Sequence, residues 1–187
     1  MIEVRPLALP EVLEIRVPRH EDKRGFFSEN WNEVAWRAAG LDHHFVQDNH
    51  SLSRQRGVLR GLHCQMPPRA QDKLVRATRG AVFDVAVDIR RGSPNFGRWV
   101  GTVLSANEGN QLLVPKGFAH GFLTLEPDTE VQYKVTAVYS PEHDRTIRFD
   151  DPDIAIDWPI GADELILSDK DRAGALLAQS ALEFPYP

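Results

Sequence analysis

Four residues in this chain are candidates for acid–base chemistry. His63 ends the segment VLRGLH, and Lys73 begins the next apolar run. Tyr133 lies within EVQYKV, and Asp171 ends the segment SDKD near the C-terminal end. A neutral histidine is a suitable base near pH 7, a lysine can stabilise an oxyanion, and a positioned tyrosine can donate a proton.

Each of these residues also has a structural interpretation. His63 can be a core histidine with its hydrogen bonds satisfied, and Lys73 a solvated lysine at a strand edge. Tyr133 can pack in the core with its hydroxyl at the rim. Asp171 lies three residues after Ser168, which is the spacing of a capping box, and the sequence alone favours that role.

The seven histidines raise the question of a metal site. The pattern from Gly57 to Gln65, followed by the segment GNQLLVPKGFAH that ends at His120, resembles the two halves of the cupin pattern. A metal-binding cupin has a second histidine where this chain has Gln65, and a glutamate where it has PRA at 68–70. Because a stable divalent site usually needs three or four ligands, we expect a cupin barrel without a metal, which leaves His63 free for proton chemistry.

Short strands must position these side chains. Ala81–Ile89 alternates strictly, with Phe83 and Val85 on one face and Val82 and Asp84 on the other. The other predicted strands, mostly separated by Gly or Pro, are Leu13–Val17, Phe45–His50, Val58–Cys64, Lys73–Thr78, Trp99–Ser105, Gln111–Val114, Gly117–Leu123 and Glu130–Tyr139. This spacing predicts a β-sandwich or barrel. Two helices are predicted, Asn32–Ala39 and Asp171–Leu182.

Two details of strand geometry bear on the candidate site. Arg60 and His63 are three residues apart, so a regular strand would point them to opposite faces, but a bulge at Gly61 would turn both inward. Tyr133 and Tyr139 are six residues apart and are predicted to share one face of the strand Glu130–Tyr139.

Length and composition narrow the class of protein. The 187 residues predict a single domain over 1–187, with a core large enough to need neither disulfides nor a structural metal. The net charge of −5 argues against a nucleic-acid partner. One cysteine, Cys64, and the absence of a signal peptide or a long apolar run predict a cytoplasmic protein with no membrane partner.

Ordered sequence blocks along most of the chain carry a specific resemblance. They are RGFFSE (24–29), FVQDNHS (45–51), VLRGLH (58–63), KLVR (73–76), VFDVAVD (82–88), PKGFAHGF (115–122), YK (133–134), YSP (139–141) and SDKD (168–171). Over residues 2–180 the chain resembles the dTDP-4-dehydrorhamnose 3,5-epimerase family. The resemblance implies an all-β double-stranded β-helix, or cupin-like jelly roll, with short peripheral helices. It also implies no cofactor and a homodimer that exchanges N-terminal strands.

The resemblance assigns a role to each candidate residue. It implies that His63 is the base, oriented by Asp171, that Tyr133 is the acid on the opposite side of the sugar ring, and that Lys73 stabilises the enolate. We expect a nearby positive charge to lower the pKa of Tyr133. The implied substrate contacts are Arg60 and His120 at the pyrophosphate or sugar, Gln47 and Asn49 at the nucleotide, Tyr139 and Asp144, and Arg24, Phe27 and Glu29 reaching the partner subunit's site.

The implied reaction is epimerisation of dTDP-4-dehydro-6-deoxy-D-glucose at C3 and C5, which gives dTDP-4-dehydro-L-rhamnose. Three alternatives stay open from the residues: a metal-dependent cupin, a sugar-nucleotide binding module without activity, and an epimerase that inverts C3 only or C5 only. Asp144 stands where the family often has glutamate, and Phe149 where it often has tryptophan. These departures concern substrate contacts rather than the catalytic residues.

Overall fold

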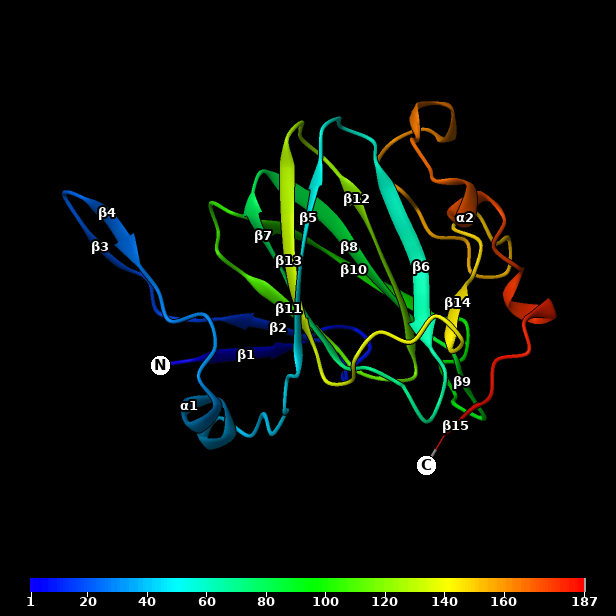
Figure 1. Cartoon of the computed structure of the whole chain (residues 1–187), viewed down its shortest axis with the longest axis horizontal. Coiled ribbons are helices and arrows are strands. Elements are labelled where there is room, and N and C mark those ends of the chain that lie inside the picture. Colours follow the sequence, from blue (N-terminus) through cyan, green and yellow to red (C-terminus); the bar gives the residue numbers. More distant parts are fainter. Residues whose placement is uncertain (187) are drawn as a thin grey trace.

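Two antiparallel sheets form the centre of the computed structural model, which describes residues 1–186 (Figure 1). The six-stranded sheet has the order β1 (Glu3–Pro6), β2 (Leu13–Arg16), β11 (Gln111–Val114), β7 (Lys73–Arg79), β13 (Thr129–Val135) and β5 (Gln47–Ser53). The five-stranded sheet has the order β10 (Trp99–Ser105), β8 (Ala81–Asp88), β12 (Phe118–Thr124), β6 (Leu59–Gln65) and β14 (Asp144–Thr146). The predicted all-β class is therefore confirmed.

Smaller elements surround these sheets. Strands β3 (His20–Asp22) and β4 (Gly25–Phe27) form a hairpin that projects away from both sheets at the upper left of Figure 1. Strands β9 (Arg90–Arg91) and β15 (Phe184–Pro185) form a short parallel pair. The helices are α1 (Glu33–Ala38) and α2 (Asp169–Arg172), with single 3-10 turns at Ala162–Glu164 and Leu177–Gln179.

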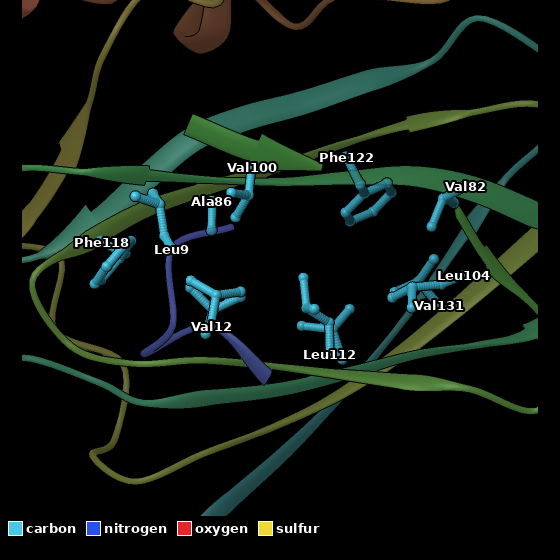
Figure 2. Packing of buried hydrophobic residues seen from close by; sticks show 12 residues of the cluster. Leu9, Val12, Val82, Ala86, Val100, Leu104, Leu112, Phe118, Phe122 and Val131 are labelled. Atoms are coloured by element: carbon cyan, nitrogen blue, oxygen red, sulfur yellow. The ribbon is translucent and has the colours of Figure 1, made fainter. Parts of the chain in front are cut away.

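The main core lies between the two sheets (Figure 2). Because side chains alternate along a strand, each sheet presents one apolar face to the other. Leu112 and Val131 come from the six-stranded sheet, and Val82, Ala86 and Phe122 come from the five-stranded sheet. All five are at most 4% exposed.

A second core covers the outer face of the five-stranded sheet. Val85 and Val87 of β8 pack there against Ile147, Leu177 and Phe184. The C-terminal segment that supplies this cover runs along the right side of Figure 1. Strand β8 is therefore buried on both faces, which explains why both of its faces are rich in apolar residues.

The predicted strands correspond to observed ones, and Trp99–Ser105 and Gln111–Val114 have the predicted bounds. The exception in length is Glu130–Tyr139, because β13 ends at Val135. After it, the Thr136 hydroxyl accepts from the backbone N–H of Asp72, and the Thr136 N–H donates to the Asp72 carbonyl. Because the Asp72 N–H is bonded to the Thr136 side chain, the regular backbone pairing stops here, and Tyr139 lies in the loop that follows. The prediction that Tyr133 and Tyr139 share one strand face is therefore wrong.

One of the two helix predictions is confirmed. The Asn32 side chain caps α1 by accepting from the N–H groups of Val34 and Ala35, each at 3.0 Å. The predicted helix Asp171–Leu182 is wrong, because α2 ends at Arg172. Beyond it the chain forms a bridge to Ile147, with hydrogen bonds that include the one from the Arg148 N–H to the Ala175 carbonyl at 2.9 Å.

Candidate active site

A cavity of about 500 Å³ collects all four predicted catalytic residues and two of the predicted binding residues. Its walls come from both sheets and from the segment 166–171. The polar predicted residues that line it are Arg60, His63, Lys73, His120, Tyr133 and Asp171. Residues from five separate parts of the sequence therefore meet in one place.

His63 and Asp171 form a hydrogen-bonded pair at the wall of this cavity. His63 Nε2 lies 2.6 Å from Asp171 Oδ1, although the two residues are 108 positions apart. The Asp171 side chain is 5% exposed and that of His63 is 28% exposed. A carboxylate can only accept here, so it holds the Nε2–H tautomer and leaves Nδ1 to take a proton.

Helix α2 fixes the position of Asp171. Ser168 is the N-cap, and its hydroxyl oxygen accepts from the Asp171 N–H at 3.2 Å. The same hydroxyl donates to Asp171 Oδ2 at 2.7 Å, so both carboxylate oxygens are engaged. The capping-box spacing is therefore confirmed for Ser168, while the Asp171 carboxylate itself points to the histidine.

The carboxyl group of Asp171 stays ionised in this setting. Burial on its own would raise its pKa, but the hydrogen bonds from His63 and Ser168 hold the pKa below its usual range. An ionised carboxylate behind the ring stabilises the imidazolium that forms when His63 takes a proton.

A β-bulge in β6 turns two neighbouring polar residues into the cavity. His63 pairs with His120 across to β12, whereas Arg60 pairs with Phe122, so β6 has one extra residue between the two pairs. Gly61 has a φ of +142° and packs so closely that a Cβ on it would lie 2.5 Å from the Cα of Gly121. The predicted bulge is thus confirmed, and glycine is required there by backbone and by space.

Lys73 and Tyr133 face His63 from the other sheet. Lys73 begins β7 and Tyr133 lies in β13, whereas His63 lies in β6. Lys73 Nζ donates to the His63 carbonyl oxygen at 3.3 Å, which places its ammonium group beside the histidine. Burial lowers the pKa of Lys73. A base on one wall and a phenol on the opposite wall is the arrangement that inversion at a carbon requires.

The expected pKa shift of Tyr133 is wrong in direction. Burial raises the pKa of the phenol, and the positive charge of Arg60 opposes this without reversing it. Tyr133 is therefore protonated at neutral pH, which is the state that a proton donor needs.

A second cavity, of about 300 Å³, adjoins the first and shares His63, Lys73, Tyr133 and Lys170 with it. The predicted substrate contacts that line this second cavity are Gln47 and Asn49, expected at the nucleotide, together with Tyr139 and Asp144. Gln47 and Asn49 both point inward because they are two residues apart on β5. The two cavities therefore join the candidate catalytic residues to further predicted substrate contacts.

Tyr139 reaches the second cavity from the loop after β13. Its backbone N–H donates to Gln47 Oε1 at 2.9 Å, and its hydroxyl donates to Asp144 Oδ2 at 3.2 Å. Lys170 forms an ion pair with the same Asp144 oxygen. Loop contacts, rather than strand alternation, therefore bring Tyr139 and Asp144 to the site.

Arg24, Phe27 and Glu29 lie away from both cavities. Arg24 and Phe27 belong to the projecting β3–β4 hairpin and its turn, where Phe27 is 70% exposed and Arg24 is paired with Asp22. Phe27 and Glu29 line a separate cavity of about 710 Å³ beside α1 and the N-terminal strand. Within one subunit these three residues do not join the candidate active site.

Gln65 stands where a metal-binding cupin has a second histidine ligand, and its side chain forms hydrogen bonds to two loop segments. Its amide nitrogen donates to the Arg69 carbonyl at 2.7 Å, and its amide oxygen accepts from the Ser140 N–H at 2.7 Å. Among residues 1–186, no group of three His, Cys, Asp or Glu side chains is arranged to hold a metal ion.

Sequence reasoning missed several residues of the site. Ser51 and Lys170 line the first cavity, and Ser51 Oγ is buried without a hydrogen-bond partner among the described residues. Asp84 is fully buried and holds His120. The sequence could have pointed to Asp84, because a carboxylate in the middle of an apolar strand needs a buried partner. Phe149 lies outside both cavities and packs near Trp158 and Ile160.

Comparison with known proteins identifies the family of this chain. A family model described as dTDP-4-dehydrorhamnose 3,5-epimerase matches residues 6–179. An enzyme of that name from Sinorhizobium fredii is 52% identical over 180 residues, which is 96% of this chain and 92% of the relative.

Solved structures share the fold over all or nearly all of the chain. An epimerase from Legionella pneumophila in complex with dTDP-4-keto-L-rhamnose is 44% identical, with a TM-score of 0.95 and full coverage of both chains. A 3′-monoepimerase from Streptomyces bikiniensis in complex with dTDP-quinovose is 34% identical, with a TM-score of 0.86, covering 92% of this chain and 87% of that one. The fold is thus the cupin-like jelly roll of these enzymes, and this chain belongs to the dTDP-4-dehydrorhamnose 3,5-epimerase family.

Proposed function

We propose that this protein epimerises dTDP-4-dehydro-6-deoxy-D-glucose at C3 and C5 to give dTDP-4-dehydro-L-rhamnose, acting as a single jelly-roll domain over residues 1–187. The observation that carries the proposal is the placement of the His63–Asp171 pair and Tyr133 on opposite walls of one cavity. The high identity to epimerases of this specificity supports it.

The reaction consists of proton transfers only. The C4 carbonyl acidifies the hydrogens on C3 and C5, and His63 Nδ1 takes one of them as the carbonyl becomes an enolate. Tyr133 then delivers a proton to the same carbon from the other face, which inverts it, and the carbonyl reforms. His63 then releases its proton to solvent and Tyr133 takes a proton from solvent, so both groups return to their starting states. The same transfers at the second carbon complete the product. The substrate is neither oxidised nor reduced overall, so the reaction needs no redox cofactor, and we propose that none is used.

The positive groups of the cavity suit the charges of this substrate. Lys73 lies beside His63 and stabilises the enolate oxygen, because a cation acts most strongly where negative charge develops. Arg60 and His120 contact the sugar and the pyrophosphate. The guanidinium group of Arg60 is well suited to bind a pyrophosphate, although the protein as a whole has a net negative charge.

The second cavity holds the nucleoside in this proposal. Gln47 and Asn49 supply amide groups, Tyr139 supplies an aromatic ring that is 54% exposed, and Asp144 fixes the Tyr139 hydroxyl. The shorter side chain of Asp144, in place of glutamate, still reaches both Tyr139 and Lys170.

We further propose a homodimer that exchanges N-terminal strands and works in the cytoplasm. β1 is an edge strand whose four residues are all exposed, and the β3–β4 hairpin extends away from the sheets (Figure 1). In the dimer, Arg24, Phe27 and Glu29 would reach the partner's nucleotide site. None of the helices in the described part of the chain is long and apolar enough to cross a bilayer.

Incubation of the purified protein with dTDP-4-dehydro-6-deoxy-D-glucose tests the proposal. We expect dTDP-4-dehydro-L-rhamnose, identified by the NMR coupling constants of its ring protons. Recovery of the substrate alone would exclude the proposed reaction.

Epimerisation at C3 only is a second candidate, because the Streptomyces bikiniensis monoepimerase shares the fold. That protein is 34% identical, whereas the Sinorhizobium fredii 3,5-epimerase is 52% identical, and this difference favours inversion at both carbons. A product inverted at C3 alone would establish the second candidate instead.

A further inference from the structure

Asp84 is a fully buried carboxylate in the middle of β8, with none of its surface exposed. Its neighbours on the same face of the strand are Val82 and Ala86, which belong to the apolar core between the sheets. An isolated charge in such a place is strongly destabilising, so a buried carboxylate needs a specific partner.

The partner is His120 on the adjacent strand β12. His120 Nε2 lies 2.8 Å from Asp84 Oδ1 and 3.0 Å from Oδ2, and the ring is only 7% exposed. His120 lines the active-site cavity and is the direct cross-strand neighbour of His63. Two histidine–aspartate pairs therefore lie side by side, and only one of them contains the base.

The contact with Asp84 fixes the tautomer of His120. An ionised carboxylate can only accept a hydrogen bond, so Nε2 must carry the hydrogen that lies between the two groups. Nδ1 is then the nitrogen left for a ligand, and the ring is held in one orientation.

We propose that Asp84 is a positioning residue for the epimerase reaction: it holds His120 as the Nε2–H tautomer, so that Nδ1 contacts the sugar ring next to His63. This inference rests on the proposed function. It assigns His120 to the sugar rather than the nucleotide, because His120 lies level with His63 in the ladder and outside the cavity that contains Gln47 and Asn49.

The charge of Asp84 also acts on Lys73. Burial lowers the pKa of the Lys73 ammonium group, and the negative charge of Asp84 is among the groups that oppose this shift. Asp84 therefore acts on two groups that line the active-site cavity, His120 and Lys73, while it does not line the cavity itself.

The kinetic test compares the kcat of variants at Asp84 with the kcat of a variant at Asp88, a matched buried aspartate. Asp84→Asn keeps the shape, and Asp84→Ala removes every acceptor at Nε2. Asp88 is the control, because it is also fully buried and on the same face of β8 but is bonded to Arg90 and Ser93, away from both cavities. We expect a loss in kcat on the order of 10²-fold or more in at least one Asp84 variant, since reversing a catalytic histidine's tautomer costs up to about 10⁴-fold.

Two further results define the outcome. The dissociation constant for dTDP should stay within about threefold in the Asp84 variants, and Asp88→Asn should keep its kcat per folded molecule. Wild-type kcat in folded molecules of both Asp84 variants would overturn the proposal. A parallel loss of dTDP affinity would also overturn it, since His120 would then serve the nucleotide.

A spectroscopic measurement tests the same proposal without any turnover. Long-range ¹H–¹⁵N spectra of the histidine rings, with His120→Gln to assign the signals, report which nitrogen carries the hydrogen. We expect Nε2–H for His120, and Nδ1–H would overturn the proposal. If the wild-type protein fails to convert the substrate while His120 shows Nε2–H, the proposed function fails and the positioning contact stands.

Discussion

His63 and Tyr133 reach one cavity from opposite sheets, His63 from β6 and Tyr133 from β13. The imidazole is held from behind by Asp171, and burial keeps the phenol protonated. An acid and a base on the same wall would return a proton to the face it left, whereas opposite walls allow inversion. This relationship sets the expectations for three variants.

Replacement of His63 by alanine should abolish turnover and leave nucleotide binding almost unchanged. In the proposed mechanism His63 contacts only the ring carbons, and the nucleotide supplies most of the binding energy. We expect kcat to fall on the order of 10²–10⁴-fold or more. His50→Ala is the matched control, because His50 lies on the outer face of β5 and pairs with Glu130. A dTDP affinity that falls as far as kcat would return His63 to the role of a core histidine.

Replacement of Asp171 by asparagine should act through His63. The cap of α2 belongs to Ser168, so the melting temperature should change little while activity falls strongly. Ser168→Ala removes the cap, at a cost of about 0.5–2 kcal/mol in stability, together with one hydrogen bond to the carboxylate, but it leaves the contact between Asp171 and His63 in place. We therefore expect it to lose more stability and less activity than Asp171→Asn. Full activity in the Asp171→Asn protein would mean that the carboxylate does not orient the base.

Replacement of Tyr133 by phenylalanine should separate proton removal from inversion. His63 can still remove a proton and return it to the same face, so hydrogen exchange with solvent should continue while inversion falls about 10²–10⁴-fold. Loss of a mere rim hydrogen bond would cost about 0.5–1.5 kcal/mol, or roughly tenfold at most. Deuterium incorporation and product stereochemistry are measured on one sample.

Tyr139→Phe is the control for this experiment. It removes only the hydroxyl that donates to Asp144, so it should weaken nucleotide binding without changing the ratio of exchange to inversion. Inversion within tenfold of the wild type in the Tyr133→Phe protein would show that another group donates the proton.

Chelation should leave activity unchanged. Gln65 uses its side-chain amide to tie β6 to two neighbouring loop segments, and the proton transfers are complete without a Lewis acid. Elemental analysis of the purified protein, followed by an assay after dialysis against EDTA, makes the comparison. A stoichiometric metal together with a loss of activity on chelation would contradict the proposed mechanism.

The strands that carry the site were predictable, because their alternation reflects burial on one or both faces. Gly61 was also informative, since a glycine between Arg60 and His63 predicts the bulge that turns both inward. These features depend on local sequence and on general packing rules. The assignment of roles to individual residues, by contrast, came from the family resemblance.

The features that sequence did not predict depend on contacts between distant segments. The helix expected over Asp171–Leu182 ends early because backbone hydrogen bonds to residues 146–148 replace helical ones. Tyr139 reaches the site from a loop, which strand periodicity cannot describe. The pKa of Tyr133 was mispredicted because its burial, which raises the pKa, outweighs the charge of Arg60.

Proton NMR of the product formed in heavy water shows which ring carbons exchange their hydrogen and which are inverted. The wild-type protein is incubated in D₂O with dTDP-4-dehydro-6-deoxy-D-glucose, and the ring positions are examined for deuterium and configuration. The proposed mechanism predicts deuterium at both C3 and C5, with both centres inverted. Deuterium and inversion at one position alone, or inversion without deuterium, would contradict it.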